Sequence, residues 1–433
     1  MKRKKFVIIL SVILWTLFLA SILQFVTTVN SINSISTEDI SKEIDSLMGG
    51  AKVSDRFSIT ENSTHYQINT TLYCEGDIIT ETNRIPKQGE YSVYVLGGSS
   101  VRWHDCKTEI LDHFLEKELE KRYPERDVGV YNFGRSGFSS FPLVTKLEEL
   151  VNTEPEMVYI YSGHNDYSNV HFKVVREKLG VFFGKNILSE PVKFIIEMAT
   201  DYPDLRRQAA RRNMISFLRE KGVLGSKVDQ TMEIANRKTL EYYKKNIETM
   251  YNLTSSHGTV LLVSTVMSNL KHKPSSPTVI KEGEKKRFYR LKEEGENLFE
   301  QGEYQKAVRK LKAAENLTEK SSKTNYRIGI AYLRMGDEEK GTEYLTRAKD
   351  QDNLNYEVRA KSGMNDYIRT LGDERTHLEN VELKKRMVER DDIYLDRSLF
   401  EDSIHINWSR GYRIWAEETA EAIEDKKIIE AER

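Results

Sequence analysis

Strand patterns alternate with helix patterns along the middle of the chain, and this alternation constrains its fold more than any other feature. Apolar runs at residues 91–97, 127–133, 157–161 and 259–264 have the length and composition of buried strands, and amphipathic helical stretches separate them. Strands that alternate with helices pair in parallel through right-handed crossovers. The sequence therefore predicts an α/β domain of three layers around a parallel sheet.

Polar or glycine-rich residues follow the ends of these predicted strands. Ser99 comes after the first strand, Gly137 after the second and Asn165 after the third, while Asp402 and His405 follow a further short strand near the C-terminus. The carboxyl ends of parallel strands meet at one edge of a sheet, where such folds bind ligands. We therefore expect residues that are far apart in the sequence to share one pocket.

The residue types at this edge fit nucleophilic catalysis by a serine. The Ser99 hydroxyl needs a base, and His405 can accept its proton once a carboxylate such as Asp402 orients the imidazole ring. The developing oxyanion needs donors, which the backbone N–H groups of Ser99 and Gly137 and the side-chain amide of Asn165 can supply. No Cys/His spacing predicts a metal site, and no cofactor is expected.

With these residues in place, the chain resembles the SGNH (GDSL-like) hydrolases. That family carries Gly-Asp-Ser after the first strand, a glycine after the second, Gly-x-Asn-Asp after the third and Asp-x-x-His near the C-terminus. The resemblance covers residues 89 to about 270 and 351–425. It implies a flavodoxin-like parallel sheet and the roles just described. The matching positions are Gly97, Gly98, Ser99, Gly137, Gly163, Asn165, Asp166, Asp402 and His405.

One position departs from the family pattern. Gly98 stands where the family has an aspartate. Asp166 is expected to support its loop rather than to react. A different interpretation of the Gly-Gly-Ser-Ser turn is a phosphate cradle made of backbone N–H groups, but no lysine follows at P-loop spacing.

The N-terminus has the pattern of a membrane anchor. Four basic residues at positions 2–5 precede an uncharged run at 6–26, which matches the roughly 20 residues that span a bilayer as a helix. The basic cluster predicts a cytoplasmic N-terminus and an extracytoplasmic remainder of a single-pass protein. A cleavable signal peptide is the alternative. Residues 28–88 would form a spacer containing a hairpin, and a disulfide between Cys74 and Cys106 is left open.

An internal repeat interrupts the predicted α/β domain. Gly295, Gly302, Leu311 and Ala314 recur 34 residues later as Gly329, Gly336, Leu345 and Ala348. This period and the helical composition resemble tetratricopeptide repeats, and a generic helical hairpin is the alternative. We expect an all-α insertion at residues 285–350 that separates residues 89–280 from 351–425, with a second helical insertion at 170–235. The repeats would offer a surface to a protein partner.

Taken together, these features predict a membrane-anchored extracytoplasmic serine esterase that acts on an O-acyl ester through an acyl-enzyme. The alternatives are an O-acyltransferase with the same triad that modifies a cell-envelope glycan, and an inactive interaction protein that works through its repeats. The substrate could be an envelope glycan or a lipid. A formal net charge of −1 gives no reason to expect nucleic acid as a partner.

Overall fold

The computed structural model describes most of the predicted α/β domain and the repeats. Among the residues it describes, no helix is both long enough and apolar enough to cross a membrane. Several predicted features lie outside these residues, namely the anchor at 6–26, Cys106, most of the insertion at 170–235 and the short strand expected before Asp402, at residues 393–396. The described residues are 38, 42, 57–62, 65–74, 77–83, 86–101, 110–171, 227–276, 278–353, 359–372, 375–383, 399–407 and 410–429.

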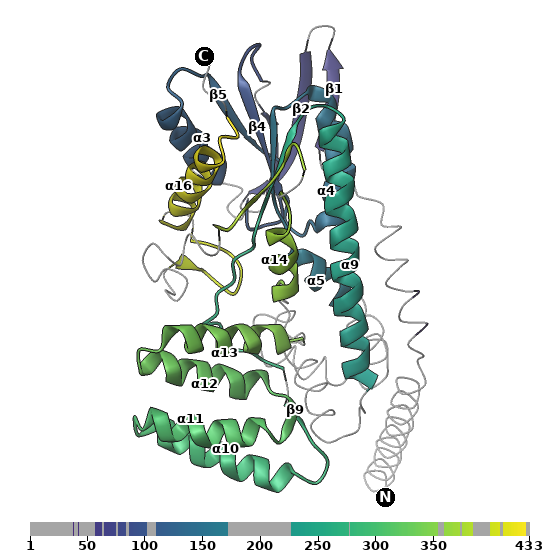
Figure 1. Ribbon diagram of the computed structural model, residues 1–433. Coiled ribbons are helices and arrows are strands. Elements are labelled where there is room, and N and C mark those ends of the chain that lie inside the picture. The colour runs from purple at the N-terminus through teal and green to yellow at the C-terminus, as the bar shows by residue number, and fades with distance from the viewer. Residues whose placement is uncertain are drawn as a thin grey trace, which may run out of the picture.

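The centre of the fold is a sheet of five parallel strands in the order β10-β7-β6-β4-β5 (Figure 1). Counted along the chain, this is the order 2-1-3-4-5 of flavodoxin-like doubly wound folds, and it fits the α/β class expected from the sequence. The order reverses at β4, so the crevice beyond the carboxyl ends of β4 and β6 is where such a fold binds ligands. The strands are β4 (Tyr91–Gly97), β5 (Val128–Asn132), β6 (Met157–Tyr161), β7 (Val260–Ser264) and β10 (Leu378–Val381).

The edge strand β10 was missed by the sequence analysis. Its four residues, Leu-Glu-Asn-Val, include two polar side chains, and only Leu378 and Val381 are buried. β10 pairs in parallel with β7, for example Leu378 with Leu261. A strand this short has too little apolar periodicity to stand out from a loop.

Helices cover both faces of the sheet (Figure 1). One face carries α3 (Leu111–Arg122) and α16 (Arg410–Asp425), which pack against each other. In α16, Tyr412, Trp415 and Ala416 recur at helical spacing and are fully buried, which explains why this helix docks. The opposite face carries α4 (Ser140–Leu150) with the short η1 (Val151–Thr153), α5 (His164–His171), α9 (Lys227–Ser255) and α14 (Ser362–Arg369).

Helix α9 differs from the prediction for its part of the chain. The predicted insertion ends at residue 235, whereas α9 already begins at Lys227 and continues to Ser255. Its first half approaches the repeats, where Glu233 forms an ion pair with Lys320 at 2.5 Å. Its second half packs on the sheet through buried Tyr243 and Ile247. One helix thus contacts both parts of the molecule.

The repeats fold as two consecutive pairs of helices, which we call the helical module. Both pairs turn at a glycine with positive φ, namely Gly302 at +78° and Gly336 at +79°. A short antiparallel pairing of β8 (Val279–Ile280) with β9 (Thr318–Lys320) accompanies the module. Its helices are α10 (Lys285–Glu300), α11 (Tyr304–Glu315), α12 (Ser322–Arg334) and α13 (Glu338–Gln351).

The repeated glycines have the same structural task in both pairs. A Cβ on Gly295 would lie 2.7 Å from Leu311 Cγ, and a Cβ on Gly329 would lie 2.8 Å from Leu345 Cγ. Each glycine therefore lets its helix approach the leucine of the following helix. The sequence period of 34 corresponds to a real repetition of helix packing.

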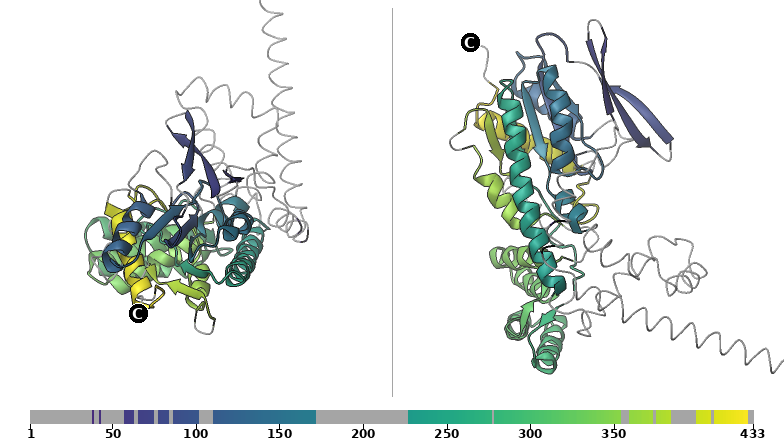
Figure 2. Two further views of the ribbon diagram at one scale, coloured as in Figure 1. Left: turned by 90° about the horizontal axis from the view of Figure 1, so that it is seen from above. Right: turned by 90° about the vertical axis from the view of Figure 1, so that its right-hand side faces the viewer.

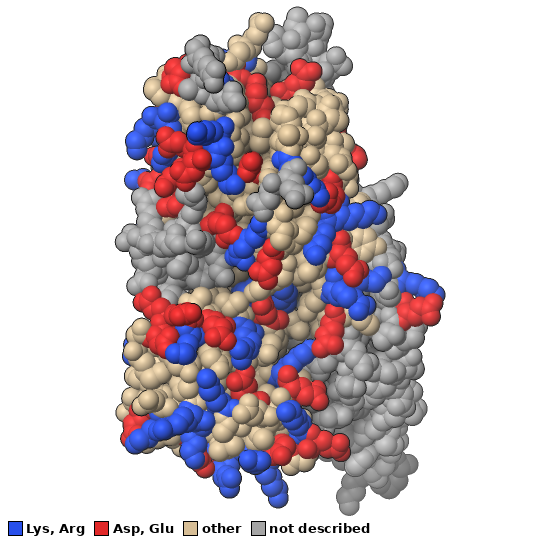
Figure 3. All heavy atoms as spheres, in the orientation of Figure 1, with Lys and Arg blue, Asp and Glu red and all other residues tan. Residues whose placement is uncertain are grey.

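A separate antiparallel sheet precedes the α/β domain (Figure 2). It contains β1 (Phe57–Asn62), β2 (His65–Cys74) and β3 (Asp77–Asn83) in that order. The hairpin of β2 and β3 was expected from the alternating pattern, whereas β1 was not. Among the described residues on the face drawn in Figure 3, basic and acidic side chains are intermingled, as the near-zero net charge suggests.

Candidate active site

Ser99 lies in the tight turn after β4 and is only 6% exposed. The turn is held by residues from two other elements. Tyr412 of α16 donates from its hydroxyl to the Ser100 carbonyl at 2.9 Å, and Asn132 donates from Nδ2 to the Val101 carbonyl at 2.9 Å. The serine is therefore fixed at the carboxyl end of the central strand.

His405 and Asp402 complete a hydrogen-bonded chain with Ser99. Ser99 Oγ lies 2.7 Å from His405 Nε2, and His405 Nδ1 lies 2.5 Å from Asp402 Oδ2. An ionised carboxylate can only accept, so Nδ1 carries the ring proton and Nε2 is left to accept from the serine hydroxyl. The structure thus brings together the three residues that the sequence proposed as nucleophile, base and orienting acid.

The Asp402 carboxylate is fixed by its own turn. Its Oδ1 accepts from the backbone N–H groups of Ile404 at 2.8 Å and His405 at 2.7 Å. Burial alone would raise the pKa of Asp402, but hydrogen bonds from the His405 ring and from these backbone groups outweigh it, and the pKa lies below its usual range. Asp402 therefore stays ionised where it orients the imidazole.

Asn165, one of the predicted oxyanion donors, adjoins the turn that carries Ser99, and so does Phe138, the residue after Gly137. Asn165 stands at the start of α5 and donates from Nδ2 to the Phe138 carbonyl at 2.8 Å. Gly137, next to Phe138, has φ of +81° and accepts from Asn169 Nδ2 at 3.1 Å through its carbonyl. The side-chain amide of Asn165 and the loop of Gly137 are thus bonded to each other beside the serine turn.

The surroundings of Gly98 leave no room for a side chain such as aspartate. A Cβ on Gly98 would overlap Nδ2 of Asn165 and would lie 3.0 Å from the Phe138 carbonyl oxygen. Any side chain at position 98 would push the Asn165 amide away from the turn. The glycine is therefore compatible with the site, and it places Asn165 directly against the residue before Ser99.

The Asp166 carboxylate is bonded to Ser140 and Ser162, which lie outside the triad. It accepts from Ser140 through both N–H and Oγ, and from Ser162 Oγ at 3.3 Å. Ser140 is the first residue of α4, so a carboxylate here satisfies the free N–H at a helix start. Burial raises the pKa of Asp166, and the bonds from Ser140 and Ser162 oppose this. Asp166 thereby fixes α4 to the start of α5, where Asn165 also lies.

His164 is a structural residue to which the sequence assigned no role. Its Nδ1 accepts from the backbone N–H of Ala360 at 3.1 Å, so Nε2 carries the proton and donates to the Met267 carbonyl at 2.8 Å. Burial lowers its pKa to about 3. The ring is therefore a neutral bridge between the chain after β7 and the chain after the helical module.

Asn269 is a second residue that the sequence analysis missed. Its backbone N–H donates to the Ser403 carbonyl and its Nδ2 donates to the Asp402 carbonyl, both at 3.0 Å. Asn269 thus holds the outer side of the turn that carries Asp402 and His405. A polar residue soon after a predicted parallel strand was the available signal, because Asn269 follows β7.

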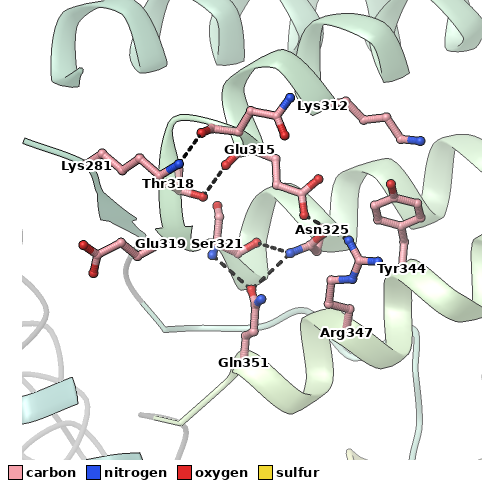
Figure 4. A pocket seen from close by; sticks show the side chains of 11 residues that line it. Lys281, Lys312, Glu315, Thr318, Glu319, Ser321, Asn325, Tyr344, Arg347 and Gln351 are labelled. Atoms are coloured by element: carbon pink, nitrogen blue, oxygen red, sulfur yellow. Dashed lines mark hydrogen bonds and ion pairs between the residues drawn. The ribbon is translucent and has the colours of Figure 1, made fainter. Parts of the chain in front are cut away.

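A separate polar pocket of about 490 Å³ opens in the helical module (Figure 4). Gln351 accepts from the Ser321 N–H and from Asn325 Nδ2, both at 3.0 Å, and Arg347 pairs with Glu315 at 3.3 Å. No member of the triad lines this pocket. Its lining residues are Lys281, Lys312, Glu315, Asn316, Thr318, Glu319, Ser321, Asn325, Tyr344, Arg347 and Gln351.

Comparison with known proteins adds little to this geometry. No protein-family model matches the chain. No curated protein matches it either. Among solved structures, a GDSL-like lipase from Bacteroides thetaiotaomicron is similar with a TM-score of 0.33 and 11% identity, over 79% of this chain and 91% of that one. A protein from Bacteroides fragilis assigned as an acylhydrolase has a TM-score of 0.33 and 12% identity, over 79% and 90% of the two chains. Likenesses this slight transfer no activity, so the chemistry has to come from the chain's own residues.

Proposed function

We propose that this protein is a serine hydrolase of the SGNH type that cleaves an O-acyl ester through an acyl-enzyme on Ser99. The observation that carries the proposal is the continuous hydrogen-bonded chain from Ser99 through His405 to Asp402. A nucleophile within hydrogen-bond reach of a base, with the base oriented by a third group, is the arrangement that activates a serine. The position of the Asn165 amide against Gly98, the residue before Ser99, supports its role as an oxyanion donor.

The reaction divides into two similar halves. In the first, Ser99 Oγ attacks the ester carbonyl carbon while His405 Nε2 takes the hydroxyl proton, and Asp402 stabilises the imidazolium that forms. The N–H groups of Ser99 and Gly137 and the Asn165 amide stabilise the oxyanion. The intermediate then expels the alcohol, which receives the proton from His405. In the second half, water repeats the attack on the acyl-enzyme, and the acid and free Ser99 are released.

An O-acyltransferase would share the first half of this reaction. In that case a sugar hydroxyl, in place of water, would take the acyl group from Ser99. The basic and apolar pattern at residues 2–26 supports a membrane-anchored, extracytoplasmic location, which makes an envelope glycan or a lipid a reasonable substrate.

The helical module is proposed to be tetratricopeptide-like and to bind a protein partner, with its polar pocket as the candidate surface.

Active-site labelling tests the proposal directly. A fluorophosphonate probe should label the wild-type protein at Ser99, and Ser99→Ala should abolish labelling. Ser100→Ala is the matched control, since it removes the neighbouring hydroxyl and should leave labelling intact. A folded wild-type protein that resists the probe would favour the inactive interaction protein. Release of free acid, compared with transfer to an added glycan, separates hydrolase from transferase.

A further inference from the structure

A line of buried polar contacts connects the helical module to the turn that carries Asp402. Asp352 caps the C-terminal end of α13, the last helix of the module. Its Oδ2 pairs with Arg359 Nη2 at 3.5 Å, and both side chains are at most 2% exposed. The same guanidinium donates from Nη1 to the Asn269 carbonyl at 2.9 Å. Arg359 therefore bridges the module and the chain that follows β7.

Asn269 connects Arg359 to the turn that carries Asp402 and His405. Its N–H and Nδ2 hold the carbonyls of Ser403 and Asp402, and its own carbonyl receives Arg359. The Asp402 side chain then binds the His405 ring on the inner side of the same turn. The contacts of Asn269 with Arg359 and with Asp402 join segments that are 90 and 133 residues apart, so neither is a by-product of local helix or strand formation.

Asp352 is itself firmly held. Its Oδ1 accepts from the backbone N–H groups of Ser275 at 3.1 Å and Ser276 at 2.9 Å, and its carbonyl accepts from Lys361 Nζ at 3.3 Å. These bonds fix the end of α13, and Asp352 can therefore hold the Arg359 guanidinium in one position. A rigid support of this kind is what holds catalytic groups in productive geometry.

The contacts of Arg359 with Asp352 and Asn269 are better suited to positioning Asn269 than to stabilising the fold. A buried ion pair adds little net stability, because desolvation offsets most of the attraction. Arginine, however, presents its donors on a rigid planar fork whose separate nitrogens reach acceptors in fixed directions, whereas lysine has one compact ammonium on a flexible stem. In this molecule the two directions are Asp352 of the module and Asn269 behind the catalytic turn.

We propose that Asn269 and Arg359 are positioning residues that set the geometry of the Asp402–His405 pair, so that the helical module is a working part of the active site. The inference rests on the proposed serine chemistry. Catalysis depends steeply on such geometry, since a misplacement of about 1 Å can cost about 100-fold in rate. The module thus helps to position Asp402, in addition to its proposed role in binding a protein partner.

The test uses the full chain and hydrolysis of p-nitrophenyl acetate. Asn269→Ala removes only the side-chain bond to the Asp402 carbonyl, and Arg359→Lys keeps the charge but replaces the rigid fork by a single ammonium on a flexible stem. Both variants should lower kcat by about 10- to 100-fold and change KM by less than about twofold. Arg327→Met is the matched control, because it removes a module ion pair with Glu296 at 2.6 Å that does not reach the turn. Its kcat should equal that of the wild type.

A second arm asks whether Asn269 acts through Asp402. In an Asp402→Asn background, Asn269→Ala should lower kcat by less than about twofold, because the backbone carbonyl at position 402 is still held but the carboxylate whose placement matters is already gone. Equal losses in both backgrounds, or a wild-type kcat in Asn269→Ala, would overturn the inference. If Arg359→Lys fails to fold by circular dichroism, Asn269→Ala decides alone. Failure of the serine chemistry itself is recognised separately, since Ser99→Ala would then hydrolyse the ester as fast as the wild type.

Discussion

Gly98 lies directly against the side-chain amide of Asn165, with no room for a Cβ between the two residues. The absence of a side chain at position 98 therefore allows the Asn165 amide, a candidate oxyanion donor, to lie beside the turn of Ser99. In a chain with aspartate at position 98, the amide would have to sit elsewhere. The glycine and the asparagine have to be considered as a pair.

Substitution of Gly98 should impair catalysis more than stability. In Gly98→Ala the new Cβ displaces the flexible Asn165 side chain, so we expect kcat to fall by about 100-fold, as when one oxyanion donor is lost. Gly98→Asp should be at least as damaging. Hydrolysis of p-nitrophenyl acetate measures the effect, and Asn165→Ala is the reference. Full activity in Gly98→Ala would contradict the role of Asn165, and the double variant should be no slower than Asn165→Ala.

Replacement of the Asp402 carboxylate should slow the reaction without preventing folding. An amide cannot hold the His405 ring in the same tautomer, so Asp402→Asn should lower kcat by up to about 10⁴-fold. The pKa of Asp402 is depressed in the folded state, so its contribution to stability is present above the unfolded value of about 3.9 and is lost as the pH falls further. Urea unfolding at pH 7 and pH 3 should therefore show a smaller gap between the two proteins at pH 3. A constant gap would argue against the ionised pair.

His164 should make the fold sensitive to mild acid. Its folded pKa of about 3 lies below the unfolded value of about 6.5, so the unfolded state binds the proton first as the pH falls. The free energy of unfolding should then decrease by up to about 1.4 kcal/mol per pH unit between pH 6.5 and pH 3. His164→Gln should be less stable at pH 7 but lose less stability on acidification. ¹⁵N spectra should show a neutral ring protonated at Nε2, and an imidazolium at pH 5 would contradict this.

The repeated glycines of the helical module should respond alike to alanine. A Cβ at Gly295 or Gly329 would press on a leucine of the next helix, and overpacking of this kind costs about 1–3 kcal/mol, more than the helix propensity that alanine gains. Gly363→Ala in α14 is the control, because its Cβ would lie 3.4 Å from Leu240 Cδ2, an ordinary contact. Thermal unfolding should rank both module variants below the wild type and Gly363→Ala at or above it. A stabilised Gly329→Ala would refute the packing role.

The strands β4 to β7 could be predicted because each is a run of apolar, mostly β-branched or aromatic residues that is buried on both faces. The same pattern placed Ser99 and Asn165 at strand ends. β10 could not be predicted, since its Leu-Glu-Asn-Val sequence becomes a strand only by pairing with β7. The parts played by His164 and Asn269 depend on partners 196 and 133 residues away, which no local pattern reveals.

The contact between Ser99 and His405 spans 306 positions and encloses the whole helical module. Such a long-range contact forms late and slowly, because the chain must close a large loop before the contact stabilises anything. During synthesis the nucleophile emerges first, and its base emerges only after all four module helices. Ser99 therefore remains an ordinary hydroxyl on the growing polypeptide, and the proposed ester chemistry has to wait for the C-terminal turn.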